Sequence, residues 1–374
     1  MNHNIPVNTP LLDGNERKYL LECLDTGWIS SEGPFIKKFE DQFSAKVGRK
    51  YGVAVSNGSV ALDAAVVALG LGPGDEVILP SFTIISCAAA IVRAGAVPVV
   101  VDSDPNTWNM DVSQVTVAIT SRTKAIMVVH IYGLPVDMDP ILELASQYNL
   151  KIIEDAAQMH GQTYKGRPCG SFGDISTFSF YPNKHITTGE GGMIVTDDPD
   201  LAEKCRSLRN LCFQAKKRFV HEALGWNLRM TNLQAALGVA QLETLDAHVV
   251  KKRANGQRYN EFFLGLPDMQ LPLVRTDYAD NIYWVYGLVL GDSYPFDADE
   301  VMLRLGVEKI GTRPFFWPMH EQPAFQKMGL FTGAHCPVAE RLARRGFYVP
   351  SGLGLTADEQ VVVADKVKAV LCGR

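Results

Sequence analysis

The sequence predicts an α/β protein built around a mostly parallel sheet. Between about residues 50 and 200, short apolar runs alternate with segments of helical periodicity, and turn-forming residues separate the two. The runs are continuously apolar, as expected of strands that helices cover on both faces. Strands that alternate with helices in this way are typical of parallel sheets.

The expected elements follow one another in chain order. Turns are expected at residues 56–59 and 72–75, where glycine, serine and asparagine or proline cluster. Strands are expected at 52–55, 76–79, 98–101, 125–129 and 151–154, and helices at 60–69, 82–93 and 140–148. Two further strands, 177–180 and 193–196, are joined by a glycine-rich loop, and one long helix is expected from 231 to about 253.

A change of character near residue 250 indicates a domain boundary. After the long predicted helix come loops with Pro267 and Pro272, an apolar segment over residues 283–290 and then short alternating elements. We therefore expect an N-terminal arm and a large domain over residues 1–250, and a small C-terminal domain over residues 251–374.

Composition and charge exclude several classes of protein. The chain has 374 residues and a net charge of −5, which disfavours a nucleic-acid binder. No run approaches the roughly 18 apolar residues of a membrane span, and the first residues lack the features of a signal peptide. The seven cysteines are scattered without C-x-x-C spacing, which fits reduced thiols better than disulfides or a zinc site. We expect a cytoplasmic protein with no nucleic-acid partner, no membrane partner and no metal.

A lysine in a glycine-rich loop is the strongest local feature. Lys184 precedes Gly189, Gly191 and Gly192 between two expected strands. Glycines allow close approach of the backbone to a ligand, and a desolvated lysine has a lowered pKa and can form a Schiff base. The alternative is a solvated lysine beside a hairpin turn, because most lysines are exposed.

Two weaker features precede this lysine. Asp155 follows the strand 151–154, at the edge where open α/β sheets bind ligands, and could keep the ring nitrogen of pyridoxal phosphate protonated. It could equally cap the following helix. The segment 56–59, Ser-Asn-Gly-Ser, lies between the first strand and its helix and could bind phosphate or simply start that helix. When a phosphate site, an acid and a lysine occur in this order on one sheet, together they indicate a cofactor site more specifically than any one of them does alone.

Several segments of the chain match a known pattern. They are LDGNER at 12–17, WISS at 28–31, NK at 183–184 with ITTGEGGM at 186–193, N-x-RMTN at 227–232 and RPFFWPMH at 313–320. On these segments the sequence resembles the sugar aminotransferases of the DegT/DnrJ/EryC1/StrS family over nearly the whole chain, and within that family it is most similar to the GDP-perosamine synthases. The resemblance implies the type I (aspartate aminotransferase-like) fold, with a large mixed-sheet domain that binds pyridoxal 5′-phosphate and a smaller C-terminal α+β domain.

The resemblance also implies catalytic roles for two residues. Lys184 would hold the cofactor as a Schiff base and then move the proton between the substrate Cα and C4′ of the cofactor. Asp155 would pair with the pyridine nitrogen, and Gln158 would lie near the ring.

Further residues would bind the cofactor phosphate and the substrate. Asn227 would reach the phosphate from a neighbouring subunit, so the protein would be a homodimer with shared active sites. The other phosphate ligands would be Gly58, Ser59 and Ser179, and the sugar nucleotide would lie near Arg229, Arg313 and His320.

The chain departs from the family pattern at a few positions. Ile84 occupies the position where the family usually stacks an aromatic residue on the cofactor ring. Gln158 stands where the perosamine synthases usually have glutamate. We expect His160 and His185 to be hydrogen-bonded residues around the site. The tryptophans Trp226, Trp284 and Trp317 are expected to pack rather than to contact ligands.

The expected reaction is transfer of an amino group from L-glutamate to a nucleotide-linked keto sugar. The best candidate substrate is GDP-4-keto-6-deoxymannose, which would give GDP-perosamine. The alternatives are another UDP-linked, dTDP-linked or non-nucleotide keto substrate, a sugar dehydratase with the same cofactor, or a non-catalytic regulator of the same fold. Lys184 favours amino transfer, because histidine replaces the lysine in the dehydratase branch.

Overall fold

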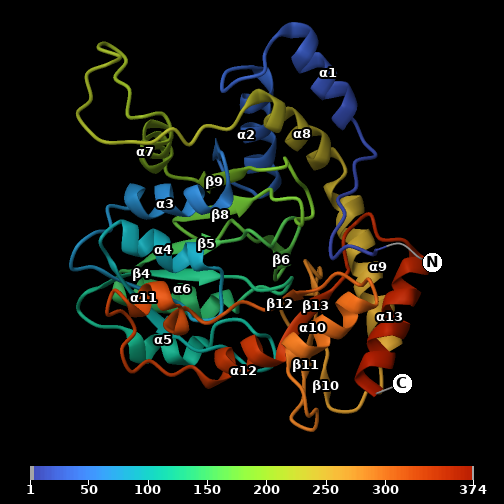
Figure 1. Ribbon diagram of the computed structural model, residues 1–374. Coiled ribbons are helices and arrows are strands. Elements are labelled where there is room, and N and C mark those ends of the chain that lie inside the picture. The colour runs from blue at the N-terminus through green and yellow to red at the C-terminus, as the bar shows by residue number, and fades with distance from the viewer. Residues whose placement is uncertain (1–3, 373–374) are drawn as a thin grey trace.

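A seven-stranded sheet forms the centre of the larger part of the molecule (Figure 1). The computed structural model describes residues 4–372. The strand order is β1-β9-β8-β5-β4-β2-β3, and β9 is antiparallel to both of its neighbours while all other neighbours are parallel. The strands are β1 (Tyr51–Val55), β2 (Glu76–Pro80), β3 (Val97–Val101), β4 (Thr123–Val129), β5 (Lys151–Asp155), β8 (Ile175–Ser179) and β9 (Gly192–Thr196). The seven predicted strands are confirmed, with small differences at their ends.

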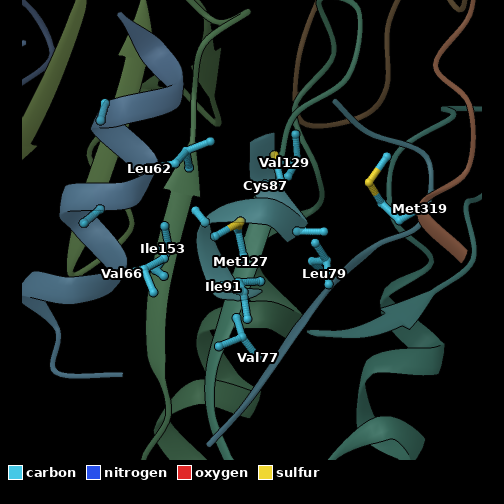
Figure 2. Packing of buried hydrophobic residues seen from close by; sticks show 14 of the residues in the cluster. Leu62, Val66, Val77, Leu79, Cys87, Ile91, Met127, Val129, Ile153 and Met319 are labelled. Carbon is cyan, nitrogen blue, oxygen red and sulfur yellow. The ribbon is translucent and has the colours of Figure 1, made fainter. Parts of the chain in front are cut away.

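Side chains of the strands alternate between two apolar clusters, one on each face of the sheet. Val77 of β2 packs in the first cluster and its neighbour Ile78 packs in the second. Figure 2 shows the first cluster, where Leu62, Cys87 and Ile153 come from two helices and a strand. Because both faces are covered, the strands are apolar throughout, as the sequence pattern indicated.

Helices cover both faces of this sheet, and one more lies outside them. The first face is covered by α3 (Gly58–Ala68), α4 (Ile85–Arg93) and α7 (Pro199–Arg209). The second face is covered by α2 (Pro34–Lys46), α5 (Val112–Ala118), α6 (Met138–Tyr148) and α8 (Asn232–Glu243), and α1 (Glu16–Thr26) packs on α8. The helix predicted from residue 82 begins only at Ile85, since Ile84 has an extended backbone (φ −69°, ψ 141°).

The prediction of one long helix from 231 to about 253 is wrong. The segment forms two helices, α8 and α9 (Leu245–Phe263), which are separated at Thr244 (φ −109°, ψ 3°). Leu245 of α9 packs in the second cluster of the large sheet, whereas Phe263 packs in a third cluster beside the small sheet. Helix α9 therefore runs from one part of the molecule into the other.

The smaller part contains a four-stranded antiparallel sheet (Figure 1). Its order is β10-β11-β13-β12, with β10 (Met269–Gln270), β11 (Tyr286–Leu290), β13 (Gly346–Val349) and β12 (Arg313–Pro314). The remaining helices are α10 (Ala298–Val307), the 3-10 turn Met319–Glu321, α11 (Pro323–Gln326), α12 (Pro337–Arg345) and α13 (Ala357–Cys372). A short hairpin lies outside both larger sheets, and its strands β6 (Thr163–Tyr164) and β7 (Arg167–Pro168) have two residues each.

The N-terminal arm packs against this smaller part. Ile5 forms a β-bridge with Ile310 and lies in the third cluster. We propose that the large domain ends near residue 250, within α9, and that the arm crosses back to the small domain.

The structure also bears on the expectations about membrane spans and about the state of the cysteines. No helix within residues 4–372 combines the length and apolar character that crossing a membrane requires. All seven cysteines are free thiols, and six of them are buried.

Candidate active site

A cavity of about 670 Å³ lies beside the carboxyl ends of β1, β5 and β8. These strands run in the same direction, so the residues that follow them meet at one edge of the sheet. We call this space the Lys184 cavity. The predicted site residues that line it are Gly58, Ser59, Ile84, Asp155, Gln158, Ser179 and Lys184.

One end of the cavity is built from the start of α3. The side chain of Asn57 caps this helix by accepting a hydrogen bond from the backbone N–H of Val60 (3.0 Å). A Cβ on Gly58 would lie 2.7 Å from Cβ of Ser179, and a Cβ on Gly192 would lie 2.4 Å from the backbone oxygen of Asn57. Glycine is therefore required for three segments of backbone to meet here. The first N–H groups of a helix lack intrahelical acceptors and bind anions such as phosphate.

Lys184 lies in a turn in which its backbone N–H donates to the carbonyl oxygen of Tyr181 (2.9 Å). Its Nζ is 3.7 Å from the ring centroid of Trp284. Burial lowers the pKa of Lys184 to about 7, and the nearby carboxylate of Asp155 opposes this shift. A substantial fraction of the amine is therefore unprotonated near neutral pH and able to attack a carbonyl.

Asp155 is buried and held by two donors. Its Oδ1 accepts a hydrogen bond from the backbone N–H of Ala157 (3.0 Å), and its Oδ2 accepts one from the thiol of Cys87 (3.3 Å). Burial raises the pKa of Asp155, while these donors and Lys184 act in the opposite direction. Gln158 is fixed by the backbone N–H of Tyr132, which donates to its Oε1 (2.6 Å).

The residues of the Lys184 cavity fit pyridoxal phosphate. The anion-binding helix start, the buried acid and the lysine with the lowered pKa suit the three polar parts of that molecule, namely its phosphate, its ring nitrogen and its aldehyde. The volume lies within the range of roughly 300–1,000 Å³ that is common for small-molecule sites. Among the described residues that line the cavity, Lys184 is the one cationic side chain.

The structure does not bring the remaining predicted residues into this cavity. Arg313 lines an adjoining space of about 220 Å³, which shares Trp284 with the Lys184 cavity. His320 lines a separate space of about 320 Å³ and binds Ser81 and Glu340 (Nδ1 to Oγ 2.7 Å, Nε2 to Oε1 3.0 Å).

The segment that carries Asn227 and Arg229 lies on another side of the molecule. Asn227 is exposed, and Arg229 lines a third space, of about 520 Å³, together with Arg206, Arg209 and Arg218. In Figure 1 the loop between α7 and α8 extends away from the body of the molecule. Within one chain, these residues are not part of the site that Lys184 defines.

The structure refines the expectations about three residues near the site. Trp284 packs in the first apolar cluster as expected, and its ring in addition faces Lys184 and lines the cavity. His185 has the expected partner, the carbonyl oxygen of Ile282 (Nε2 to O 3.1 Å). For His160, neither ring nitrogen has a close hydrogen-bond partner among the described residues, and only a weak interaction with the backbone of Ser179 acts on its pKa. Its ring packs instead between aromatic residues that include Phe178.

Other contributors could not be found from local sequence patterns. Cys87, which donates to Asp155, lies inside α4, and Phe316 and Tyr348 reach the cavity from the small sheet and its connections. Each comes from a segment that is distant in sequence from Lys184. No turn, glycine pattern or charge marked them.

This mixed sheet, with a buried acid at the end of β5 and a lysine in the loop between β8 and β9, defines a pyridoxal-phosphate-dependent enzyme of the type I aminotransferase fold. The chain belongs to the DegT/DnrJ/EryC1/StrS aminotransferase family, whose sequence model matches residues 10–368.

Named relatives and solved structures agree with this assignment. The chain is 46% identical over 362 residues to a GDP-perosamine synthase of Caulobacter vibrioides, and the match covers 96% of each chain. It is 42% identical to a GDP-perosamine synthase of Escherichia coli O157:H7, over 97% of each chain.

Solved structures give the same fold. The aminotransferase TlmJ from Streptoalloteichus hindustanus is similar with a TM-score of 0.91 and 31% identity, over 99% of each chain. The S. venezuelae enzyme DesV is similar with a TM-score of 0.86 and 36% identity, over 95% of this chain and 93% of that one.

Proposed function

We propose that the chain transfers the amino group of L-glutamate to the keto group of a nucleotide-linked 4-keto-6-deoxy sugar. The best candidate substrate is GDP-4-keto-6-deoxymannose, and the product would be GDP-perosamine. The observation that carries the amino-transfer part is Lys184, which lies beside Asp155 in the cavity with a lowered pKa. The choice of sugar is supported by relatives named GDP-perosamine synthase at 46%, 42% and 40% identity.

The residues of the Lys184 cavity would divide the work of binding. The start of α3 with Gly58 and Ser59, together with Ser179, would hold the phosphate through N–H and hydroxyl donors. Asp155 would accept a hydrogen bond from the ring nitrogen and keep a proton on it. Gln158, oriented by the N–H of Tyr132, would lie beside the ring.

Lys184 would bind and release the cofactor and move a proton. When bound, pyridoxal phosphate supplies an electron-accepting ring and carries the amino group from donor to acceptor. The Nζ of Lys184, with its pKa near neutrality, would move a proton between the donor's Cα and C4′ of the bound cofactor, because an acid–base group works best when its pKa is close to the working pH. The aromatic wall of Trp284, Phe316 and Tyr348 would exclude water during these steps.

The active form would be a homodimer. The nucleotide sugar carries a diphosphate, yet Lys184 is the one cationic side chain among the described residues of the cavity. The exposed Asn227 and the half-buried Arg229 lie on the segment that follows an extended loop. The side chains of this loop include the exposed Phe219 and Leu224. If a second subunit packs against this loop, Asn227 and Arg229 of the first subunit would lie at the cavity of the second. The buried free thiols support a reducing cytoplasm as the location.

The function is tested with GDP-, UDP- and dTDP-linked keto sugars and L-glutamate, with products identified by mass spectrometry. The GDP sugar is expected to gain an amino group, and Lys184→Ala is expected to lose turnover and the visible absorbance of the bound cofactor. Lys165→Ala removes an exposed lysine that pairs with Asp139 and is the matched control, expected to retain both.

Each outcome distinguishes one part of the proposal. Amination of only a UDP or dTDP sugar contradicts the perosamine assignment and leaves amino transfer intact. Loss of water without an amino sugar points to the dehydratase alternative. Full activity of Lys184→Ala contradicts the role of this lysine.

A further inference from the structure

Trp284 contacts the reactive lysine in two ways. Its indole ring faces Nζ of Lys184 at 3.7 Å, and its Nε1–H donates to the carbonyl oxygen of Asn183 (2.9 Å), the residue before that lysine. The tryptophan is 5% exposed and lies just before β11, a hundred residues along the chain from the loop it holds. Both the tip and the backbone of the Lys184 segment are therefore restrained by one side chain.

Trp284 is itself anchored from behind. Lys252 of α9 is buried, and its Nζ donates to the carbonyl oxygen of Trp284 (2.9 Å) and to that of Ser351. The ring of Tyr132, a buried residue of the first apolar cluster, also packs against the indole with centroids 5.7 Å apart. These contacts fix the plane of the indole, so that the ring is a rigid surface and not a mobile gate.

We propose that Trp284 is a positioning residue for Lys184, whose indole face holds the free amine in the cavity whenever the lysine is not bonded to the cofactor. The inference deepens the proposed function and rests on it. A lysine side chain has four rotatable bonds, so a free amine without such a surface would sample many positions. The electron-rich ring face attracts the protonated amine, and the same apolar ring shields the neutral amine from water.

Few titratable side chains lie near Lys184, and the part of the fold that carries each of them is identified. The carboxylate of Asp155 at the end of β5 favours the protonated amine. The rings of His160 and His185 lie nearby and are neutral, because burial lowers the pKa of each. Lys252 lies behind Trp284, and burial lowers its pKa to about 7. Replacing Trp284 leaves all of these groups in place, so a change at Lys184 can be assigned to the indole.

The test compares Trp284→Phe with Trp284→Leu in protein freed of cofactor. Both variants shorten the side chain and lose the Nε1–H donor, and only the phenylalanine keeps an aromatic face. The pKa of Lys184 is measured by trace acetylation with acetic anhydride across pH, followed by peptide mass spectrometry. The rate at which added pyridoxal phosphate is captured is measured by absorbance. Trp317→Leu, which removes an exposed ring next to Arg344 instead, is the matched control.

We expect the pKa of Lys184 to be higher in the phenylalanine variant than in the leucine variant by roughly half a pH unit, the effect of an aromatic face on a nearby cation. Capture of pyridoxal phosphate should be fastest in the wild type and slowest in the leucine variant. Equal pKa values and equal capture rates in the wild type and both variants would overturn the inference.

Circular dichroism and thermal unfolding check that each variant is folded. If the leucine variant does not fold, Trp284→Met replaces it and the same comparison with phenylalanine applies. Because these measurements use apo protein and no sugar, they fail or succeed independently of the substrate assignment. Absence of amino transfer in the wild type contradicts the proposed function instead.

Discussion

The carboxylate of Asp155 receives its two hydrogen bonds from unlike donors, a backbone N–H and a thiol. The N–H of Ala157 is fixed by the chain, whereas the donor on Oδ2 is the side chain of Cys87, which also contacts Oγ1 of Thr83 (3.3 Å). Burial raises the pKa of the Cys87 thiol well above its usual value, so the sulfur keeps its proton and remains a donor. A single substitution can therefore remove one of the two donors without changing the acid.

Cys87→Ala is expected to weaken binding of pyridoxal phosphate to the apo protein. Loss of one hydrogen bond to a buried carboxylate costs about 1 kcal/mol, or roughly a fivefold rise in Kd. Cys87→Ser keeps a donor and should retain most of the affinity. Kd is measured by titration of apo protein with cofactor. Cys205→Ala removes another buried thiol, on α7, and should leave Kd unchanged. A Kd for Cys87→Ala equal to the wild-type value would show that the thiol does not support Asp155.

Residues of the site could be predicted from sequence where local pattern and chemistry coincide. Lys184 and Asp155 were marked by a glycine-rich loop and by the end of an apolar strand, and both line the cavity. Cys87 and Trp284 carried no such mark, because a cysteine in an apolar helix and a tryptophan beside a strand are ordinary core residues. Their roles arise only from tertiary packing.

At the scale of elements, the start of α3 depends on close packing against β8. Gly58→Ala places a Cβ 2.7 Å from Cβ of Ser179, a distance at which one of the two segments must shift. Overpacking of this kind costs about 1–3 kcal/mol, and the shift would disturb the anion-binding N–H groups. We expect a lower melting temperature and a Kd for pyridoxal phosphate raised by roughly tenfold or more.

The matched control is Gly306→Ala. Gly306 lies in α10, where an added Cβ meets nothing within 4 Å, so this change should be neutral or slightly stabilising. Thermal unfolding and cofactor titration of both variants make the comparison. Normal cofactor affinity in Gly58→Ala would contradict the role assigned to the start of α3.

Helices and strands could be predicted from sequence where one hydrophobic periodicity dominates. They could not be predicted where tertiary packing decides whether a helix continues or breaks. The apolar strands of the large sheet stood out because both faces are buried. The break at Thr244 did not, since helical spacing continues through it. The turn there lets α8 pack on α1 and α2 while α9 runs towards α13, and these partners come from distant parts of the chain.

For the whole molecule, buried bases make stability depend on pH. Burial and then the charge on Lys184 lower the pKa of His160 to about 3, and burial places the pKa of His185 well below its usual value. In the unfolded chain these histidines have pKa values near 6.5. The unfolded state therefore binds more protons below pH 6.5, and the stability present above that pH is lost as the pH falls towards 3.

We expect the free energy of unfolding of the apo protein to decrease between pH 7 and pH 4. Each histidine that stays neutral in the fold contributes up to about 1.4 kcal/mol per pH unit below 6.5. His160→Leu should reduce this slope, and His221→Asn, which changes an exposed histidine, should not. The slope of the unfolding free energy against pH is measured by urea unfolding at several pH values. An unchanged slope in His160→Leu would mean that His160 is protonated in the fold.

The proposed sharing of active sites between two subunits makes a prediction about mixed dimers. In the proposed homodimer, Lys184→Ala and Asn227→Ala are each expected to be inactive alone, because the first lacks the reactive amine and the second lacks the side chain that would reach the cavity of its partner. Unfolded and refolded together in equal amounts, they should regain about a quarter of the wild-type activity, because half the dimers are mixed and each restores one site. No recovery would contradict sites shared between subunits.

The path of the N-terminal arm sets a rule for building chimeras between related enzymes. The backbone of Ile5 pairs with Ile310, and the carbonyl oxygens of Val7 and Thr9 accept hydrogen bonds from the N–H groups of Ser351 and Gly354. A graft of residues 251–372 alone would thus set a foreign small domain against the host's arm. An exchange of the proposed small domain should therefore carry residues 4–10 with residues 251–372, so that both packing partners come from one parent.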